Sequence, residues 1–236
     1  MDGHAQQVRE SVVFVIVAFI LLFLMSQTHV GDMHIMSTVA HGQPQDIDDE
    51  GGVKDDEEHI LNDTWTMYFH EPSDTDWTMS SYVRLDQISS VERFWQVHEG
   101  VRKYLSRGMF FLMREHVFPC WDDSSNIHGG CVSIKVLKED ICVFWQEAVT
   151  RLLGEKIMLA ETSDAWSHVN GISTSPKRFF CICKLWLKDD VFIDRKHFDL
   201  PMRYHGEPLY RSNVENIRTS QAVVTTTPSR SSRQSA

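Results

Sequence analysis

The chain has 236 residues, of which 42% are hydrophobic and 24% are charged, so it can bury a core as one domain with two tails. Its formal net charge of −10 argues against a protein that binds nucleic acids in general through a basic surface. The charge is uneven, because residues 1–58 hold eleven acidic against two basic side chains, whereas the remaining residues hold 22 against 21. A nearly neutral body leaves room for a local basic site.

Residues 12–25 form an uninterrupted apolar run near the N-terminus. A membrane-spanning helix needs about 20 apolar residues, so the run is short for that role, and no convincing signal-peptide cleavage site follows it. Three interpretations stay open: a membrane anchor with the body on the cytosolic side, a later translation start at Met33 or Met36, or secretion. We assign residues 1–36 to this apolar N-terminal segment.

The five cysteines contain no CxxC pair and suggest no disulfide framework, which is typical of a reducing compartment and predicts a cytoplasmic body. Residues 37–58 are acidic and rich in Gly and Asp, and residues 216–236 are rich in Ser and Thr. Neither segment can bury much apolar surface, so we expect both to be disordered. Residues 59–215 form the predicted folded domain.

Strands and helices alternate within this domain. A helix is predicted to begin near Ser89, which has capping-box spacing to Glu92, and a second helix is predicted over residues 139–153, ended by Gly154. Period-two or continuous apolar runs predict strands over residues 65–69, 82–85, 109–113, 131–137 and 179–187. The strands outnumber the helices, so we expect an α+β fold with a curved, mainly antiparallel sheet and helices on one face.

Each predicted helix carries a Phe-Trp pair, Phe94-Trp95 in the first and Phe144-Trp145 in the second. Neighbouring helical residues point about 100° apart, so a narrow core stripe cannot bury both rings. Either one ring is exposed and offers a seat for a partner helix, or a wide buried stripe takes both.

A second group of aromatic residues has the chemistry of a binding site. Trp121 follows Pro119 and precedes Asp122 and Asp123, and Trp77 lies 44 residues earlier. Two facing indoles and one carboxylate would hold a cationic purine such as a methylated guanine, by stacking, cation–π attraction and hydrogen bonds to the base edge. The alternative is that Trp121 is a core residue and the two acids form a solvated turn.

The order of these motifs over residues 59–186 resembles the cap-binding translation initiation factor 4E family. The matching motifs are His59, Trp65, Tyr68, Trp77, Val91-Glu92-x-Phe94-Trp95, Pro119-x-Trp121-Asp122, Gly129-Gly130, Phe144-Trp145-x-Glu147, Leu153-Gly154-Glu155 and Trp186.

The resemblance implies a curved sheet with about three helices packed on its convex face and an mRNA cap-binding slot on its concave side. Trp77 and Trp121 would stack on 7-methylguanine, Asp122 would stand where the family has a glutamate that reads the base, and Trp186 would lie against the methyl group. The triphosphate would be met by nearby cations, namely Lys177, Arg178 and Lys184.

On the convex face, the resemblance implies binding of a scaffold subunit or of a competing repressor helix. The residues carried over to this role are His59, Val91, Trp95, Glu147 and Gly154. The implied function is cap binding and translation initiation through scaffold recruitment. Gln146 and Thr150 stand where the family carries leucines on this face, which leaves two alternatives: a cap-binding repressor, or a membrane-associated protein that keeps the fold without cap binding.

Other chemistries find little support. The spacing of His116, Cys120, His128 and Cys131 fits no standard zinc site, and the sequence contains no nucleophile elbow, phosphate-binding glycine loop or dinucleotide fingerprint. We therefore expect no metal, no cofactor and no enzymatic activity.

Overall fold

The computed structural model describes residues 58–159 and 165–226. Within them the chain divides into two compact units: the smaller holds residues 58–60 and Ser90–Val101, and the larger holds the rest. The apolar run at residues 12–25 and almost all of the acidic linker lie outside the described residues. Among the residues that are described, no helix is both long and apolar enough to cross a membrane.

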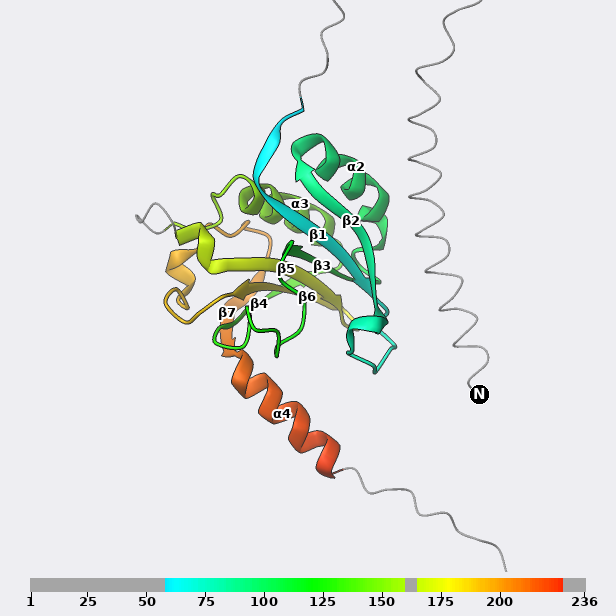
Figure 1. Cartoon of the computed structure of the whole chain (residues 1–236), viewed down its shortest axis with the longest axis vertical. Coiled ribbons are helices and arrows are strands. Elements are labelled where there is room, and N and C mark those ends of the chain that lie inside the picture. The colour runs from blue at the N-terminus through cyan, green and yellow to red at the C-terminus, as the bar shows by residue number, and fades with distance from the viewer. Residues whose placement is uncertain (1–57, 160–164, 227–236) are drawn as a thin grey trace, which may run out of the picture. The chain divides into compact units, whose positions relative to one another are not determined.

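The larger unit is built on a seven-stranded sheet in the order β2-β1-β3-β5-β6-β4-β7 (Figure 1). Neighbouring strands run antiparallel in every pairing whose register is defined. The strands are β1 (Ile60–His70), β2 (Tyr82–Ser90), β3 (Met109–Arg114), β4 (Gly130–Leu137), β5 (Val169–Pro176), β6 (Phe180–Leu187) and β7 (His205–Ser212). The predicted fold class, an α+β domain with a curved antiparallel sheet and about three helices, is confirmed.

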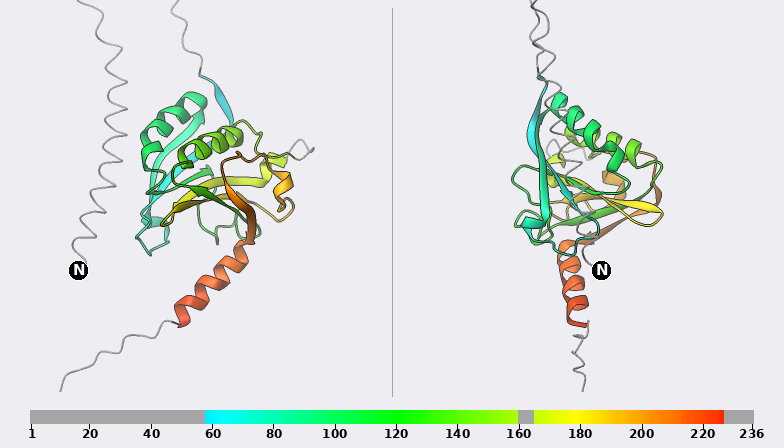
Figure 2. Two further views of the ribbon diagram at one scale, coloured as in Figure 1. Left: turned by 180° about the vertical axis from the view of Figure 1, so that it is seen from behind. Right: turned by 90° about the vertical axis from the view of Figure 1, so that its right-hand side faces the viewer.

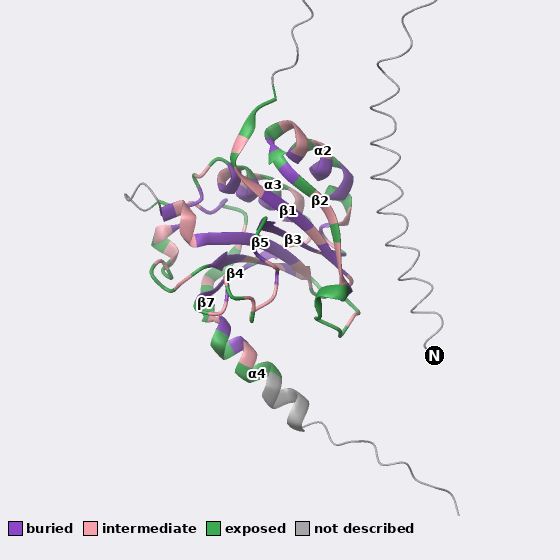
Figure 3. Ribbon diagram, viewed as in Figure 1, coloured by how far each residue is buried: buried purple, intermediate pink, exposed green. Residues whose placement is uncertain are grey.

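Side chains alternate between the two faces of this sheet, as strand geometry requires. Phe110 and Leu112 of β3 point to one face and are fully buried. Figure 3 shows β5, the neighbouring strand, as mostly buried. The opposite face carries an apolar cluster of Phe111, Met113, Val117, Cys131 and Trp186. The sheet therefore has a closely packed face and a second face whose apolar cluster lies next to partly buried aromatic rings.

Helix α3 (Ile141–Leu153) lies across the sheet, and Figure 2 shows it in front when the unit is seen from behind. Phe144 and Trp145 are both fully buried, so the wide-stripe interpretation holds for this helix. The helix ends at Gly154, as predicted, and the Gly154 N–H donates to the Thr150 carbonyl at 3.0 Å. The left-handed backbone conformation at this end belongs to the next residue, Glu155, with φ 58°.

Helix α4 (Asn213–Thr226) follows β7 directly (Figure 1). It corrects the predicted boundary of the C-terminal tail, because residues 216–226 were expected to be disordered and are helical. The polar composition of this segment hid the helix. Asn213 and Asn216 are buried at its start, so side-chain burial at the end of β7 supports the first turn.

The smaller unit contains α2 (Val91–Val101). Ser90 Oγ accepts a hydrogen bond from the Arg93 N–H at 3.3 Å, so the helix is capped by Ser90 and the capping box predicted at Ser89 is wrong by one residue. The Glu92 carboxylate instead accepts a bond from the His59 N–H at 3.0 Å and lies 2.7 Å from His59 Nδ1. Trp95 of the first Phe-Trp pair is 38% exposed, which agrees with the interpretation that one ring of a pair is exposed.

The turn before β4 explains why a glycine stands at position 129. A Cβ there would lie 1.9 Å from the Leu187 carbonyl oxygen. The nearest atoms all belong to the backbone, so no side chain can move aside to make room for the Cβ. We expect Gly129→Ala to lower the free energy of unfolding by about 3 kcal/mol, measured by urea denaturation.

The matched control is Gly206→Ala. Gly206 has φ +72°, but a Cβ there meets nothing within 4 Å, so only left-handed strain of about 1 kcal/mol is expected. Equal losses for the two variants would contradict the packing explanation.

Candidate functional site

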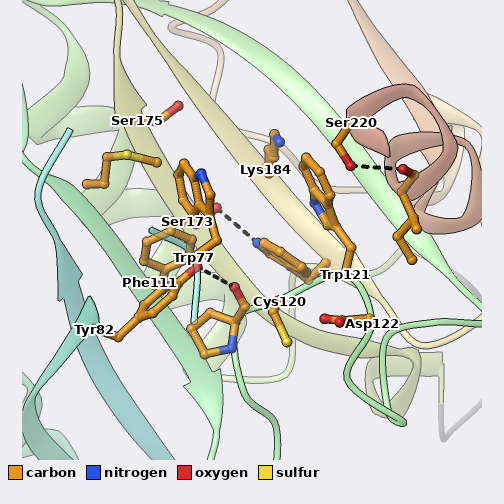
Figure 4. Close-up of a pocket in the computed structure, with 14 residues that line it drawn as sticks. Trp77, Tyr82, Phe111, Cys120, Trp121, Asp122, Ser173, Ser175, Lys184 and Ser220 are labelled. Carbon is orange, nitrogen blue, oxygen red and sulfur yellow. Dashed lines mark hydrogen bonds between the residues drawn. The ribbon is translucent and has the colours of Figure 1, made fainter. Parts of the chain in front are cut away.

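A pocket of about 430 Å³ opens on the sheet face that carries the apolar cluster described above, here called the Trp186 cluster (Phe111, Met113, Val117, Cys131 and Trp186). Strands β3, β5 and β6 form its floor, the loop before β4 forms one wall, and α4 contributes a further edge (Figure 4). The lining residues are Trp77, Tyr82, Met109, Phe111, Pro119, Cys120, Trp121, Asp122, Ser173, Ser175, Lys184, Trp186, Ile217 and Ser220. All of them belong to the larger unit.

Trp77 presents an open indole to this pocket. Its ring is 51% exposed, yet it stacks on the fully buried His70 with ring centroids 4.3 Å apart and planes inclined by 2°. His70 is itself held, because its Nε2 lies 2.8 Å from the Asp76 carbonyl oxygen. One face of the Trp77 indole is thus supported by the protein, which leaves the other face for a ligand.

Trp121 lies on the opposite side of the pocket from Trp77 (Figure 4). It packs against the Trp186 cluster while remaining partly exposed, and the Lys184 ammonium lies 5.4 Å from the centre of its ring. Asp122 is exposed and Asp123 half-buried in a turn, as the alternative interpretation expected of the two acids, but Trp121 and Asp122 also line the pocket. The two indoles and Asp122 share one cavity.

Trp186 forms part of the pocket floor and is almost completely buried. Its indole N–H donates to Ser173 Oγ at 2.9 Å, which satisfies the one polar group of the ring (Figure 4). This bond fixes the orientation of the ring edge that faces the pocket. Ser173 and Ser175 follow the alternation of β5 onto the same face.

Lys184 is the cation of the pocket. Burial lowers the pKa of its ammonium, and the positive charges of Lys177 and Arg211 lower it further. Arg211 is paired with Cys131 across β7 and β4, and Cys131 in turn with Trp186 across β4 and β6. Three basic residues therefore act on one region of this face, which makes it attractive to an anion.

Lys177 and Arg178 lie in the turn between β5 and β6 and are not among the residues that line the pocket. The Lys177 N–H closes this turn by donating to the Phe180 carbonyl at 2.7 Å, and the Arg178 guanidinium lies 4.8 Å from the centre of the Phe179 ring. Their predicted contact with phosphate stays a prediction.

Several pocket residues were not singled out from the sequence. Met109 and Phe111 follow from the period of two along β3, so strand alternation could have indicated them. Ile217 and Ser220 lie three positions apart on α4, a helical spacing within the segment expected to be disordered. Only the recognition of that helix would have revealed them.

The residues predicted to bind a partner fall in both units. In the smaller unit, Val91 and Trp95 are exposed on α2, and His59 contacts Glu92. In the larger unit, Glu147 of α3 lies 3.3 Å from Arg151, one helical turn away. The exposed surface of α3 beside it carries the polar residues Gln146 and Thr150 together with the apolar Val143, which is 41% exposed.

Comparison with known proteins assigns the family. The model of the family described as "Eukaryotic initiation factor 4E" matches residues 60–199, which is more than half of the chain, and the chain belongs to this family. Eukaryotic translation initiation factor 4E of Eremothecium gossypii is 29% identical over 140 residues, which cover 56% of this chain and 64% of that protein. The Saccharomyces cerevisiae factor is 26% identical over 142 residues, with coverages of 57% and 64%. The chain thus matches just under two thirds of the length of each relative.

Solved structures agree on the fold. Ascaris suum eIF4E-3 in complex with the m7G cap superposes with a TM-score of 0.51 at 18% identity, covering 57% of this chain and 76% of that one. Caenorhabditis elegans eIF4E-3 with the 4E-binding protein Mextli and a cap analogue gives a TM-score of 0.50, also at 18% identity, with coverages of 56% and 75%.

Cys120 provides a chemical test of the pocket walls. Burial, a hydrogen bond with Asp122 and the charge of that carboxylate together raise the pKa of its thiol to about 12. Because the thiolate is the reactive form, we expect Cys120 to react with Ellman's reagent at pH 8 more than tenfold more slowly than a cysteine peptide, although it is partly exposed.

Two variants complete this measurement. Cys120→Ser removes the kinetic phase that belongs to Cys120 and so identifies it. Asp122→Ala should accelerate that phase, because one cause of the raised pKa of the Cys120 thiol is lost. A rate in Asp122→Ala equal to that of the unmodified protein would show that the carboxylate does not act on the thiol.

Proposed function

We propose that this protein binds the 7-methylguanosine cap of mRNA and takes part in translation initiation by recruiting a scaffold subunit. The observation that carries the proposal is the single pocket in which Trp77 and Trp121 lie on opposite sides, with Asp122 and Lys184 at its edges. Structural neighbours with the same fold were solved with cap ligands.

The chemistry of the pocket suits a cationic purine. Methylation fixes a positive charge on the guanine ring, and a desolvated cation between two indole faces gains about 2 kcal/mol beyond ordinary stacking. The indole of Trp77 is already held by His70, so little side-chain entropy is lost when the base enters. Selectivity for the methylated base follows from its charge.

Asp122 is the proposed reader of the base edge. Its carboxylate would accept hydrogen bonds from the guanine N–H groups, which are charge-assisted and therefore strong. It is one methylene shorter than the glutamate of the family, so the base must lie closer to the loop or be reached through water.

Lys184 is the proposed phosphate contact, since it alone among the three predicted cations lines the pocket. Lys177 is close enough to influence its titration and would add to the anion-attracting field, whereas Arg178 is engaged with Phe179. Phosphate binding would favour the charged ammonium and offset the effect of burial.

The second part of the proposal concerns α2. Val91 and Trp95 form an exposed apolar surface on this helix, of the kind that an amphipathic partner helix can cover. His59 and Glu92 contact each other beside it and could orient the partner. Glu147 and Gly154 on α3 stay predicted members of the partner site.

One observation favours a second candidate function, that of a cap-binding repressor. Gln146 and Thr150 are exposed polar residues on α3, which would weaken docking of a scaffold helix and leave cap binding without recruitment. The third option, a membrane-associated protein without cap binding, depends on residues 12–25, which lie outside the described part of the chain.

We further propose that the protein is a binding module with no enzymatic activity or cofactor and that it acts in the cytoplasm. In support, all five cysteines are free thiols. Within the described residues, no group of three or more His, Cys, Asp or Glu side chains is placed to hold a metal ion.

Replacement of Asp122 tests base reading. Asp122→Ala should cost about 1–3 kcal/mol of binding free energy for 7-methyl-GTP, because charge-assisted hydrogen bonds are lost. The neighbouring Asp123→Asn is the matched control, since it removes the same charge from a residue that does not line the pocket and keeps an oxygen that can accept the Ser125 N–H bond. Isothermal titration calorimetry measures both, and equal losses would assign the effect to general electrostatics.

Replacement of Trp95 tests partner binding. Trp95→Ala should abolish binding of a scaffold-derived helical peptide, measured by fluorescence anisotropy, and leave 7-methyl-GTP binding unchanged. Phe179→Ala removes a more exposed aromatic ring from the turn between β5 and β6 and should not affect the peptide. If the unmodified protein binds cap but no scaffold peptide, the repressor function replaces the initiator function.

A further inference from the structure

The loop that carries Trp121 and Asp122 has no regular secondary structure, so its backbone polar groups need other partners. Three consecutive carbonyls just before Trp121 are held by side chains. Asn126 Nδ2 donates to the Phe118 carbonyl at 2.9 Å and to the Cys120 carbonyl at 2.8 Å. The hydroxyl of Tyr82 donates to the Pro119 carbonyl at 3.1 Å.

Asn126 is completely buried, and every polar group of the residue is engaged. Its side-chain oxygen accepts a bond from Asn170 Nδ2 at 2.9 Å, and its backbone carbonyl accepts one from Asn213 Nδ2 at 2.8 Å. Its backbone N–H donates to the Asp123 carbonyl at 2.9 Å. A buried amide with all of its bonds made is rigid and has one orientation.

The same residue connects two walls of the pocket. Asn213 is the first residue of α4, and Ile217 and Ser220 of that helix also line the pocket. Asn170, in β5, also donates to the Ser125 carbonyl at 2.7 Å and so ties this loop to the sheet. The three asparagines form one buried set that joins the loop, the sheet and α4.

We propose that Asn126 is a positioning residue: it sets where Trp121 and Asp122 meet the ligand without contacting the ligand itself. The inference deepens the proposed cap-binding function and rests on it. An amide suits this position because it donates two bonds and accepts another on a short stem. Aspartate lacks the donors, and an apolar residue would leave the Cys120 carbonyl without its side-chain donor and the Phe118 carbonyl with only the Cys120 N–H.

The test compares Asn126→Ala with Asn170→Ala in the full chain. Asn126→Ala removes three side-chain hydrogen bonds and Asn170→Ala removes two, of which the bond between the two residues is lost in both. Only Asn126→Ala takes the side-chain donor away from the Cys120 carbonyl and one of two donors away from the Phe118 carbonyl. We expect Asn126→Ala to raise the Kd for 7-methyl-GTP by about tenfold or more and Asn170→Ala to raise it much less, at similar losses of Tm.

A second readout does not depend on the ligand. Fluorine NMR of fluorotryptophan-labelled protein, with the Trp121 signal assigned by Trp121→Phe, reports the local order of each indole. In Asn126→Ala the Trp121 signal should broaden or shift while that of Trp145, a fully buried residue of α3, stays in place. Asn126→Ser, which keeps one donor, should give a smaller effect and serves as the milder variant.

Equal loss of affinity in the two alanine variants, or an unchanged Trp121 signal in Asn126→Ala, would overturn the proposal. So would failure of both Asn126 variants to fold while Asn170→Ala folds, because Asn126 would then serve the stability of the fold alone. If the unmodified protein does not bind 7-methyl-GTP, the proposed function fails, and the Trp121 signal still decides the role of Asn126.

Discussion

The parallel stacking of the Trp77 ring on the His70 ring is the interaction on which the pocket depends. An exposed tryptophan in a loop would normally rotate or collapse onto the surface, because burial of its large ring is favourable. Here a buried imidazole stacks on one indole face, 4.3 Å away, and is itself anchored at the Asp76 carbonyl. The second face is thereby kept open, and a flat ligand can be met without rearrangement.

The opposite side of the pocket is built by different means. Trp121 and Asp122 belong to an irregular loop, so their positions depend on side chains that bind its carbonyls, above all Asn126 and Tyr82. Trp186 adds a fixed floor through its bond to Ser173. An aromatic stack, a buried amide and an indole hydrogen bond therefore hold one preformed site, which suits selective recognition of a single ring.

Much of this could be predicted from the sequence, and the failures have physical reasons. The continuous apolar run of β6 and the Gly154 stop of α3 gave clear signals, and the family resemblance implied one site for Trp77, Trp121 and Trp186, which all line one pocket. Strand β5 was missed because its Gly, Asn, Ser and Pro residues give no apolar alternation, and α4 because its stability depends on buried asparagines rather than on an apolar stripe. Contacts such as His70 on Trp77 require the fold to be known.

The most direct test of the central claim is a tryptophan fluorescence titration of the full chain with 7-methyl-GTP and, in parallel, with GTP. If Trp77 and Trp121 enclose the methylated base, 7-methyl-GTP will quench the fluorescence at micromolar or lower concentration, and GTP will bind about thirtyfold more weakly, which corresponds to a cation–π contribution of about 2 kcal/mol. Equal binding of the two nucleotides, or no quenching by either in folded protein, would contradict the account.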